Sequence, residues 1–215
     1  MSYIGSYGTL EQCKQEFLLI LKGTRRNGMD RLLDYMQKDT DFFTAPYVSS
    51  HLPSKIVQIG GLLRHTLNVY SRLLLEYSHE NQLQVGGDHG SEAEKIKQIC
   101  DTLAVVGLLH PLYQANRYSI VTKSELSSET GAFTETEVLQ RRDDIFGYGR
   151  GDESVYKLSG FIRLNREEAF AIRFQDGDFG DENNRRAFCN NKLALMLYTA
   201  ILKAEFIDDQ IQLKV

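Results

Sequence analysis

The sequence has few cysteines and little net charge, and each shortage excludes a class of protein. The three cysteines, Cys13, Cys100 and Cys189, form no CxxC pair, and their odd number is typical of reduced thiols in a cytosol. The 25 Lys and Arg residues against 29 Asp and Glu residues give a net charge of −4. A chain so balanced is not expected to bind extended nucleic acid, which normally requires a clearly basic surface.

Long hydrophobic runs and targeting signals are also missing. The longest apolar runs, 17–21, 73–75 and 103–108, are far shorter than the roughly 18 residues of a membrane span. The first residues, MSYIGSYGTLEQ, contain neither a basic region nor an apolar core, so no secretion signal is expected. We therefore expect a cytoplasmic protein without a membrane partner, and its 215 residues predict a single domain, 1–215.

Most of the patterns that the sequence does contain are typical of α-helices. Thr9, Ser91 and Asn165 are each followed three residues later by Gln or Glu, the capping-box pattern of a helix start. Elsewhere apolar residues recur at helical spacing. Together these signals predict helices from about Thr9 to Leu21, over 29–36, over 59–77, from Ser91 to about Gly107, over 165–174 and over 192–205.

Three other segments are expected to be irregular or extended. The stretch DFFTAPYVSSHLPS (41–54) carries two of the three prolines and predicts a connection along the surface. QDGDFGDENN (175–184) predicts a polar loop. In the block 117–145, the β-type RYSIVT, the turn-rich SELSSETGAF and the alternating TETEVLQ predict a β-hairpin. The expected fold is mainly α, with N-terminal helices in 1–50 and a β-hairpin insertion at about 117–145.

Two histidines lie at core-facing positions of separate predicted helices. His65 is in phase with the apolar face of 59–77, and His110 is the next inward position after the helix that begins at Ser91. Imidazole is a common neutral metal ligand, although a single buried histidine more often belongs to the core. A glycine-rich phrase, GYGRG (147–151), either lets backbone N–H groups approach a phosphate or forms a plain loop.

The phrases GGLLRHTLNVY (60–70) and LAVVGLLHPLYQANRYSI (103–120) resemble the HD-domain phosphohydrolase superfamily, in a branch often found in phages and prophages. The similarity continues through 146–174 and 192–206. The resemblance implies an HD-like helical bundle. It also implies a divalent metal held by a first His, a His-Asp pair and a distal Asp.

This chain keeps only two residues of that set, His65 and His110. At the other positions the residue type has changed: Pro111 stands for the Asp of the pair, Gln114 for a Lys, Arg150 and Gln175 for two histidines, and Tyr198 and Ile201 for the His and Asp of the last helix. Hard divalent ions prefer oxygen ligands, which two imidazoles do not supply. A guanidinium at Arg150 repels a metal ion but can hold a phosphate through two hydrogen bonds.

The resulting hypothesis is a catalytically inactive HD-like protein that binds a phosphate-containing small molecule, with no metal and no cofactor. The phage-type resemblance implies a nucleotide sponge that sequesters a host immune signal in the host cytosol, and a homo-oligomer is compatible with the sequence. The expected ligand-binding residues are His65, His110, Arg150, Gln175 and Tyr198, followed by Arg64, Arg117, Tyr148 and Arg173.

Three alternatives remain open at this point. One is an active metal-dependent phosphohydrolase whose missing carboxylates are replaced by Asp101, Asp152, Asp176 or Asp178. Another is a protein-interaction module that inhibits a partner by surface contact. The last is a relic domain in which the altered site residues only fill space.

Overall fold

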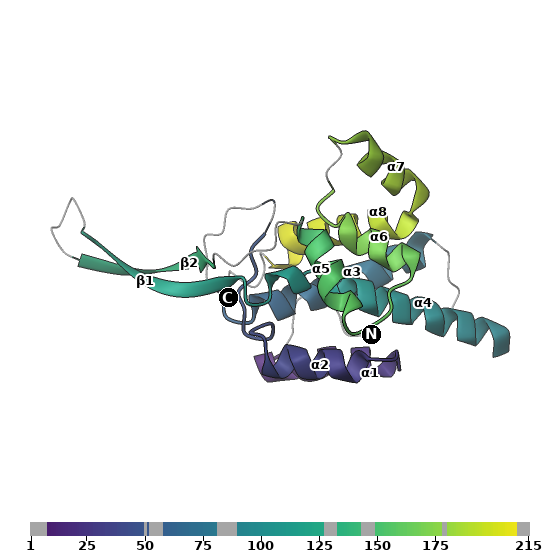
Figure 1. The fold of residues 1–215 in the computed structure, drawn as a ribbon, viewed down its shortest axis with the longest axis horizontal. Helices are drawn as coiled ribbons and strands as arrows, with labels where there is room; N and C mark the ends of the chain where they lie inside the picture. The colour runs from purple at the N-terminus through teal and green to yellow at the C-terminus, as the bar shows by residue number, and fades with distance from the viewer. Residues whose placement is uncertain are drawn as a thin grey trace.

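A computed structural model describes residues 8–49, 51, 58–80, 90–126, 133–142, 149–177 and 180–209. It shows a helical body from which a two-stranded hairpin extends to one side (Figure 1). The prediction of a mainly α protein with a β-hairpin is confirmed. None of its helices, within these ranges, has the length and apolar character that crossing a membrane requires.

The N-terminal part consists of helices α1 (Leu10–Gly23) and α2 (Met29–Lys38). The capping box predicted at Thr9 is present: its hydroxyl accepts the Gln12 backbone N–H, and the Gln12 side chain accepts the Thr9 N–H. Both helices bury the apolar faces that their spacing predicted, and α1 packs on the central helices α3 and α4.

The core is built on α3 (Gly61–Glu80), α4 (Gly90–Leu109) and α8 (Lys192–Lys203), with α3 packed against both of the others. Helices α3 and α4 approach closely at Gly107, where a Cβ would lie 3.0 Å from the Cα of Tyr70. The capping box predicted at Ser91 concerns a side chain outside those that the structure describes. Helix α4 ends directly before His110 and Pro111, as expected from the restricted backbone of a residue that precedes proline.

The outer helices differ in part from the prediction. Helix α6 (Arg166–Arg173) has the predicted Asn165 capping box. Two helices were not predicted: α5 (Arg150–Ser159), which begins inside the glycine-rich phrase 147–151, and α7 (Glu182–Asn190), which begins inside the predicted loop 175–184. That loop prediction was wrong at its end, because the Asp181 carboxylate accepts the Asn184 backbone N–H and so caps the first turn of α7.

Two short irregular helices flank the central ones. A 3₁₀ turn, η1 (Leu112–Gln114), follows Pro111. A π-helical turn, η2 (Ala204–Asp208), continues α8, which the sequence predicted to end near Glu205.

The hairpin consists of β1 (Tyr118–Leu126) and β2 (Phe133–Arg141), which pair antiparallel from Tyr118↔Arg141 to Leu126↔Phe133. Both strands lie inside the predicted block 117–145. Arg117 and Arg142 extend the ladder by one step at its root, through a 2.9 Å hydrogen bond from the Arg142 N–H to the Arg117 carbonyl.

Candidate functional site

The two histidines singled out by the sequence lie beside each other in the core. His65 on α3 and His110 after α4 have ring centroids 5.6 Å apart, with the ring planes at 62°. Their residues are 1% and 2% exposed, so both rings are effectively out of water. The inward phase predicted for each of them is therefore confirmed.

Each imidazole uses one ring nitrogen to hold its orientation. His65 Nδ1 lies 2.8 Å from Asp209 Oδ2, and His110 Nδ1 lies 2.9 Å from the Gly107 carbonyl oxygen. Because a carboxylate and a carbonyl only accept hydrogen bonds, Nδ1 is the protonated nitrogen in both rings. In the neutral rings Nε2 then carries a lone pair, and His65 Nε2 is buried without a hydrogen-bond partner among the described residues.

Burial fixes the charge state of His110. Desolvation lowers the pKa of His110 well below 6.5, and the neighbouring His65 lowers it further. His110 is therefore a neutral ring near pH 7, with a lone pair on Nε2.

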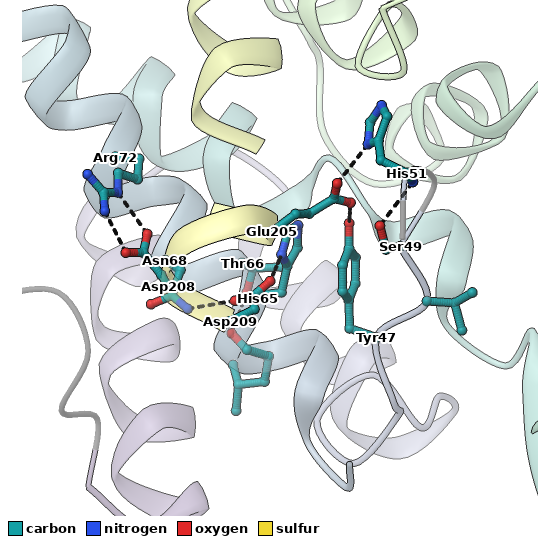
Figure 2. Close-up of polar contacts among 12 residues, drawn as sticks. Tyr47, Ser49, His51, His65, Thr66, Asn68, Arg72, Glu205, Asp208 and Asp209 are labelled. Atoms are coloured by element: carbon teal, nitrogen blue, oxygen red, sulfur yellow. Dashed lines mark hydrogen bonds and ion pairs between the residues drawn. The ribbon is translucent and has the colours of Figure 1, made fainter. Parts of the chain in front are cut away.

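Tyr47 covers one face of His65. The two rings are stacked, with centroids 3.6 Å apart and planes 11° from parallel. The Tyr47 hydroxyl donates a hydrogen bond to Glu205, whose other oxygen lies 2.7 Å from His51 Nδ1 (Figure 2). Burial, followed by the Glu205 charge, raises the pKa of Tyr47 well above its ordinary value, so the phenol stays protonated. The prediction that the 41–54 connection runs along the surface was therefore wrong in its first part, because Phe42 and Phe43 lie in the core and Tyr47 packs against it.

The carboxylates of this cluster come from the π-helical turn η2 and the residue after it. Asp209 Oδ1 accepts a 2.8 Å hydrogen bond from Asn68 Nδ2, and the buried Asp208 holds the Arg72 guanidinium through bonds of 2.7 and 2.6 Å (Figure 2). Both contacts reach α3, one and two turns beyond His65. π-turns widen a helix locally and are frequent at functional sites. Here the turn directs successive carboxylates onto α3.

A small cavity lies beside His110 and Tyr47. Its volume is about 10 Å³, enough for a single water molecule. The residues that line it come from the 41–54 connection, from 110–114, from the segment after α6 and from α8: Tyr47, His110, Pro111, Tyr113, Gln114, Gln175, Asp176 and Ile201.

The two glutamines of the cavity differ in their hydrogen bonding. The Gln114 carboxamide is fully used, because it accepts the Val48 N–H and donates to the Val48 carbonyl and the Tyr113 hydroxyl. Gln175 Nε2, by contrast, is buried and has no acceptor among the described residues. The cavity lining therefore includes a glutamine whose donor group has no acceptor among the described residues.

Arg150 brings a positive charge close to this cavity. It is the first residue of α5, its side chain is 41% exposed, and its Nη1 lies 3.8 Å from Asp176 Oδ1. Burial acts to lower the pKa of Arg150, but Tyr113 and Asp176 outweigh it and the net shift is upward. The guanidinium is a permanent cation close to two of the cavity-lining residues.

The other basic candidates form contacts outside the cavity, although the Arg117 guanidinium also lies 5.3 Å from the ring centroid of Tyr113, which lines it. Arg117 forms a buried ion pair of 2.7 Å with Glu153, and Arg173 forms an exposed pair of 2.8 Å with Asp152. Arg64 contacts the carbonyl of Gly8. None of these three lines the cavity.

The remaining candidates are spread over several places. The ring of Tyr198 lies against Gly177 and 6.1 Å from that of His51. Of the aspartates considered as replacement ligands, Asp176 lines the cavity and Asp101 pairs with Lys97. Tyr148 and Asp178 lie outside the described residues.

Sequence reasoning missed the second half of the site. The missed side chains are those of Tyr47, His51, Asn68, Glu205 and Asp209. Asn68 follows His65 by three residues on the same helix, and Glu205 follows Ile201 by one helical turn, so spacing alone could have indicated both. Tyr47 and His51 carry no such signal, since they come from an irregular segment.

The donor set fits a metal ion only in part. Both imidazoles have the orientation found at metal centres, where the second ring nitrogen binds a carboxylate or carbonyl. The nearby carboxylates hold the back of His65 and the Tyr47 hydroxyl instead of facing a common point with the two Nε2 atoms. Within the described ranges, no group of three or more His, Cys, Asp or Glu side chains is arranged to hold a metal.

Comparison with known proteins gives no relative for this chain. No family model, no curated protein and no solved structure matches it.

Proposed function

We propose that this protein binds the phosphate group of a small molecule beside the His110 cavity and releases it unhydrolysed. The observation that carries the proposal is Gln175 Nε2, a buried N–H donor with no acceptor among the described residues; the next residue, Asp176, lies 3.8 Å from the cationic Arg150. Unsatisfied buried donors are costly, so a bound acceptor oxygen would be stabilised there. The resemblance to HD-domain phosphohydrolases supports a phosphate-bearing ligand, and its phage-type branch supports a sequestered nucleotide signal.

The size of the cavity limits how such a ligand sits. Space for one water accommodates one phosphate oxygen, not a nucleoside. The rest of the molecule would lie outside, beside Arg150. A phosphate would also compete with Asp176 for the guanidinium, and their 3.8 Å separation is at the outer limit of an ion pair.

Binding without cleavage is supported by how the carboxylates are used. Metal-assisted hydrolysis needs ligands that hold an ion and lower the pKa of its water. Asp209 is bound to His65 and Asn68, and Glu205 to Tyr47 and His51, so neither is available as it stands to complete a coordination shell.

A ligand panel tests the proposal. The melting temperature is measured with inorganic phosphate, mono- and dinucleotides and cyclic nucleotides, because a ligand of the native state stabilises it by mass action. Each stabilising compound is then recovered and checked for cleavage. We expect Arg150→Ala to weaken binding about 10- to 100-fold, the value of a charge-assisted hydrogen bond. Arg166→Ala, which removes an exposed arginine that contacts Phe170, is the matched control.

Two results would contradict this proposal. One is stabilisation by no phosphate compound, which would favour the protein-interaction module. The other is equal binding by Arg150→Ala, Arg166→Ala and the unmodified protein, which would remove Arg150 from the site.

The second candidate function is an active metal-dependent phosphohydrolase. It is favoured by the fixed Nδ1 contacts of His65 and His110, which leave Nε2 as the ring nitrogen of each histidine that could bind a metal ion. This candidate predicts a divalent ion in the purified protein and phosphoester hydrolysis that a chelator abolishes. It also predicts that His65→Ala removes both the ion and the hydrolysis, whereas the first proposal predicts neither ion nor turnover.

A further inference from the structure

The β1–β2 hairpin is an arm with open edges. Figure 1 shows it extending well beyond the helical body. Within the described residues its sheet has two strands, so each strand has one edge without a strand partner. A two-stranded hairpin of this kind is at best marginally stable in water, and unpaired edges are templates for further strand pairing.

The hydrogen-bond pattern shows which backbone groups face outward. The Arg142-to-Arg117 bond marks 117/142 as a hydrogen-bonded pair. Bonded and non-bonded pairs alternate in an antiparallel ladder, so 119/140, 121/138 and 123/136 are bonded inward. The backbone groups of the other set face away from the hairpin: Ile120, Thr122 and Ser124 on β1, and Glu135, Glu137, Leu139 and Arg141 on β2.

The charges along β2 select a partner. Glu135 and Glu137 lie in the half towards the tip, while Arg141 lies at the root with Arg142 beyond it, and all four are exposed. A second β2 strand running antiparallel brings the acidic half of each copy against the basic half of the other. Opposite charges across strands stabilise a pair, whereas a parallel arrangement would place like charges together.

One antiparallel register satisfies both the backbone and the charges. With Val138 on the two-fold axis, Glu137 faces Leu139 of the second copy and Glu135 faces Arg141 of the second copy, all from the outward set. The two hairpins then form one four-stranded sheet, with two Glu–Arg pairs related by symmetry. The same patch serves both partners, as a two-fold interface requires.

An exposed apolar side chain on β2 is consistent with a strand that a second copy of the chain covers. Phe133, at the start of β2, is 73% exposed. We propose that the β2 edge of the hairpin arm is a dimerisation surface that takes a second copy of this chain, antiparallel, into a four-stranded sheet. This proposal is independent of the phosphate-binding function.

Proline substitution on the two edges provides a matched test. Glu137→Pro removes an outward N–H of β2, and Thr122→Pro removes the corresponding outward N–H of β1; neither affects a bond inside the hairpin. Sedimentation velocity from micromolar to sub-millimolar concentration measures the oligomeric state, and helical circular dichroism checks folding. We expect dimers for the unmodified chain and for Thr122→Pro, and monomers for Glu137→Pro.

Charge reversal tests the register without proline. Glu135→Arg alone places arginine opposite arginine, and Arg141→Glu alone places glutamate opposite glutamate, so each variant should be monomeric. Mixed in equal amounts, the two variants should form a heterodimer, because every cross-strand pair is then opposite in charge. High salt should weaken the unmodified dimer by screening the pairs.

Three results would overturn the proposal. They are a monomeric unmodified chain over the whole concentration range, dissociation by Thr122→Pro instead of Glu137→Pro, and failure of the mixed charge variants to associate.

Discussion

Tyr47 lies flat against His65, with ring centroids 3.6 Å apart and planes 11° from parallel, although the two residues come from a connecting segment and a core helix. The tyrosine covers the imidazole face, while Asp209 holds its edge at 2.8 Å. The orientation of His65 therefore depends on one residue that precedes α3 and on one from the carboxyl end of the described chain.

Asp209→Ala should lower the free energy of unfolding by about 1–3 kcal/mol, because His65 Nδ1 and Asn68 Nδ2 lose their shared acceptor. Urea unfolding measures the loss. The control Asp34→Ala removes an exposed pair with Lys38 and should cost no more than about 0.5 kcal/mol. Equal effects of the two substitutions would show that Asp209 does not hold the cluster.

The low pKa of His110 gives stability a definite pH dependence. Since the folded-state pKa is below the ordinary 6.5, protons bind the unfolded chain more readily, so the contribution is complete above pH 6.5 and falls as the pH drops below it. His110→Asn keeps a donor for the Gly107 carbonyl but does not titrate. Its unfolding free energy, measured by urea between pH 5 and about 7.5, should fall less steeply than that of the unmodified chain. Parallel curves would contradict a buried neutral His110.

Arg72→Met should be strongly destabilising, by about 3 kcal/mol, because it leaves the fully buried Asp208 carboxylate without its bidentate partner. The double variant with Asp208→Leu should recover part of the loss, since no buried charge remains. Arg186→Met, which breaks an exposed pair with Glu182, is the control and should be nearly neutral. Thermal and urea unfolding should give the same order of stability for these variants. A double variant that is no more stable than Arg72→Met would refute the explanation.

Gly177→Ala should displace the ring of Tyr198, one of the predicted ligand-binding residues. Gly177 has φ +66°, a left-handed conformation that costs an L-residue about 1–2 kcal/mol, and a Cβ there would lie 2.2 Å from the Tyr198 ring. We expect a loss of unfolding free energy above that range, together with a changed near-ultraviolet circular dichroism signal from displaced tyrosine. Gly23→Ala, whose Cβ meets nothing within 4 Å, should be neutral or slightly stabilising.

Local sequence patterns predicted much of the fold. The helices around Leu32, Leu67 and Leu197 follow from apolar spacing, and the hairpin follows from β-type residues on both sides of a turn-rich segment. Helix α5 was missed because its glycine-rich start resembles a loop, and α7 because its cap, Asp181, lies in a polar stretch.

The candidate site was predictable only where its residues lie on regular helices. His65 and His110 could be paired because each has a phase on an apolar face. The contact of Tyr47 with Glu205 spans 158 positions, and that of His65 with Asp209 spans 144. No local pattern encodes contacts over such separations, and the π-turn that enables them shifts the helical phase after Ala204.

The dependence of α3 on η2 also bears on how the protein is made. Ribosomes deliver the chain from its amino end, so His65, Asn68 and Arg72 emerge more than a hundred residues ahead of the carboxylates that will neutralise or orient them. Until then the nascent helix must keep these polar groups hydrated. The core is therefore completed only at a late stage of biosynthesis. A chain terminated before residue 204 would have an α3 helix that lacks its contacts with Asp208 and Asp209.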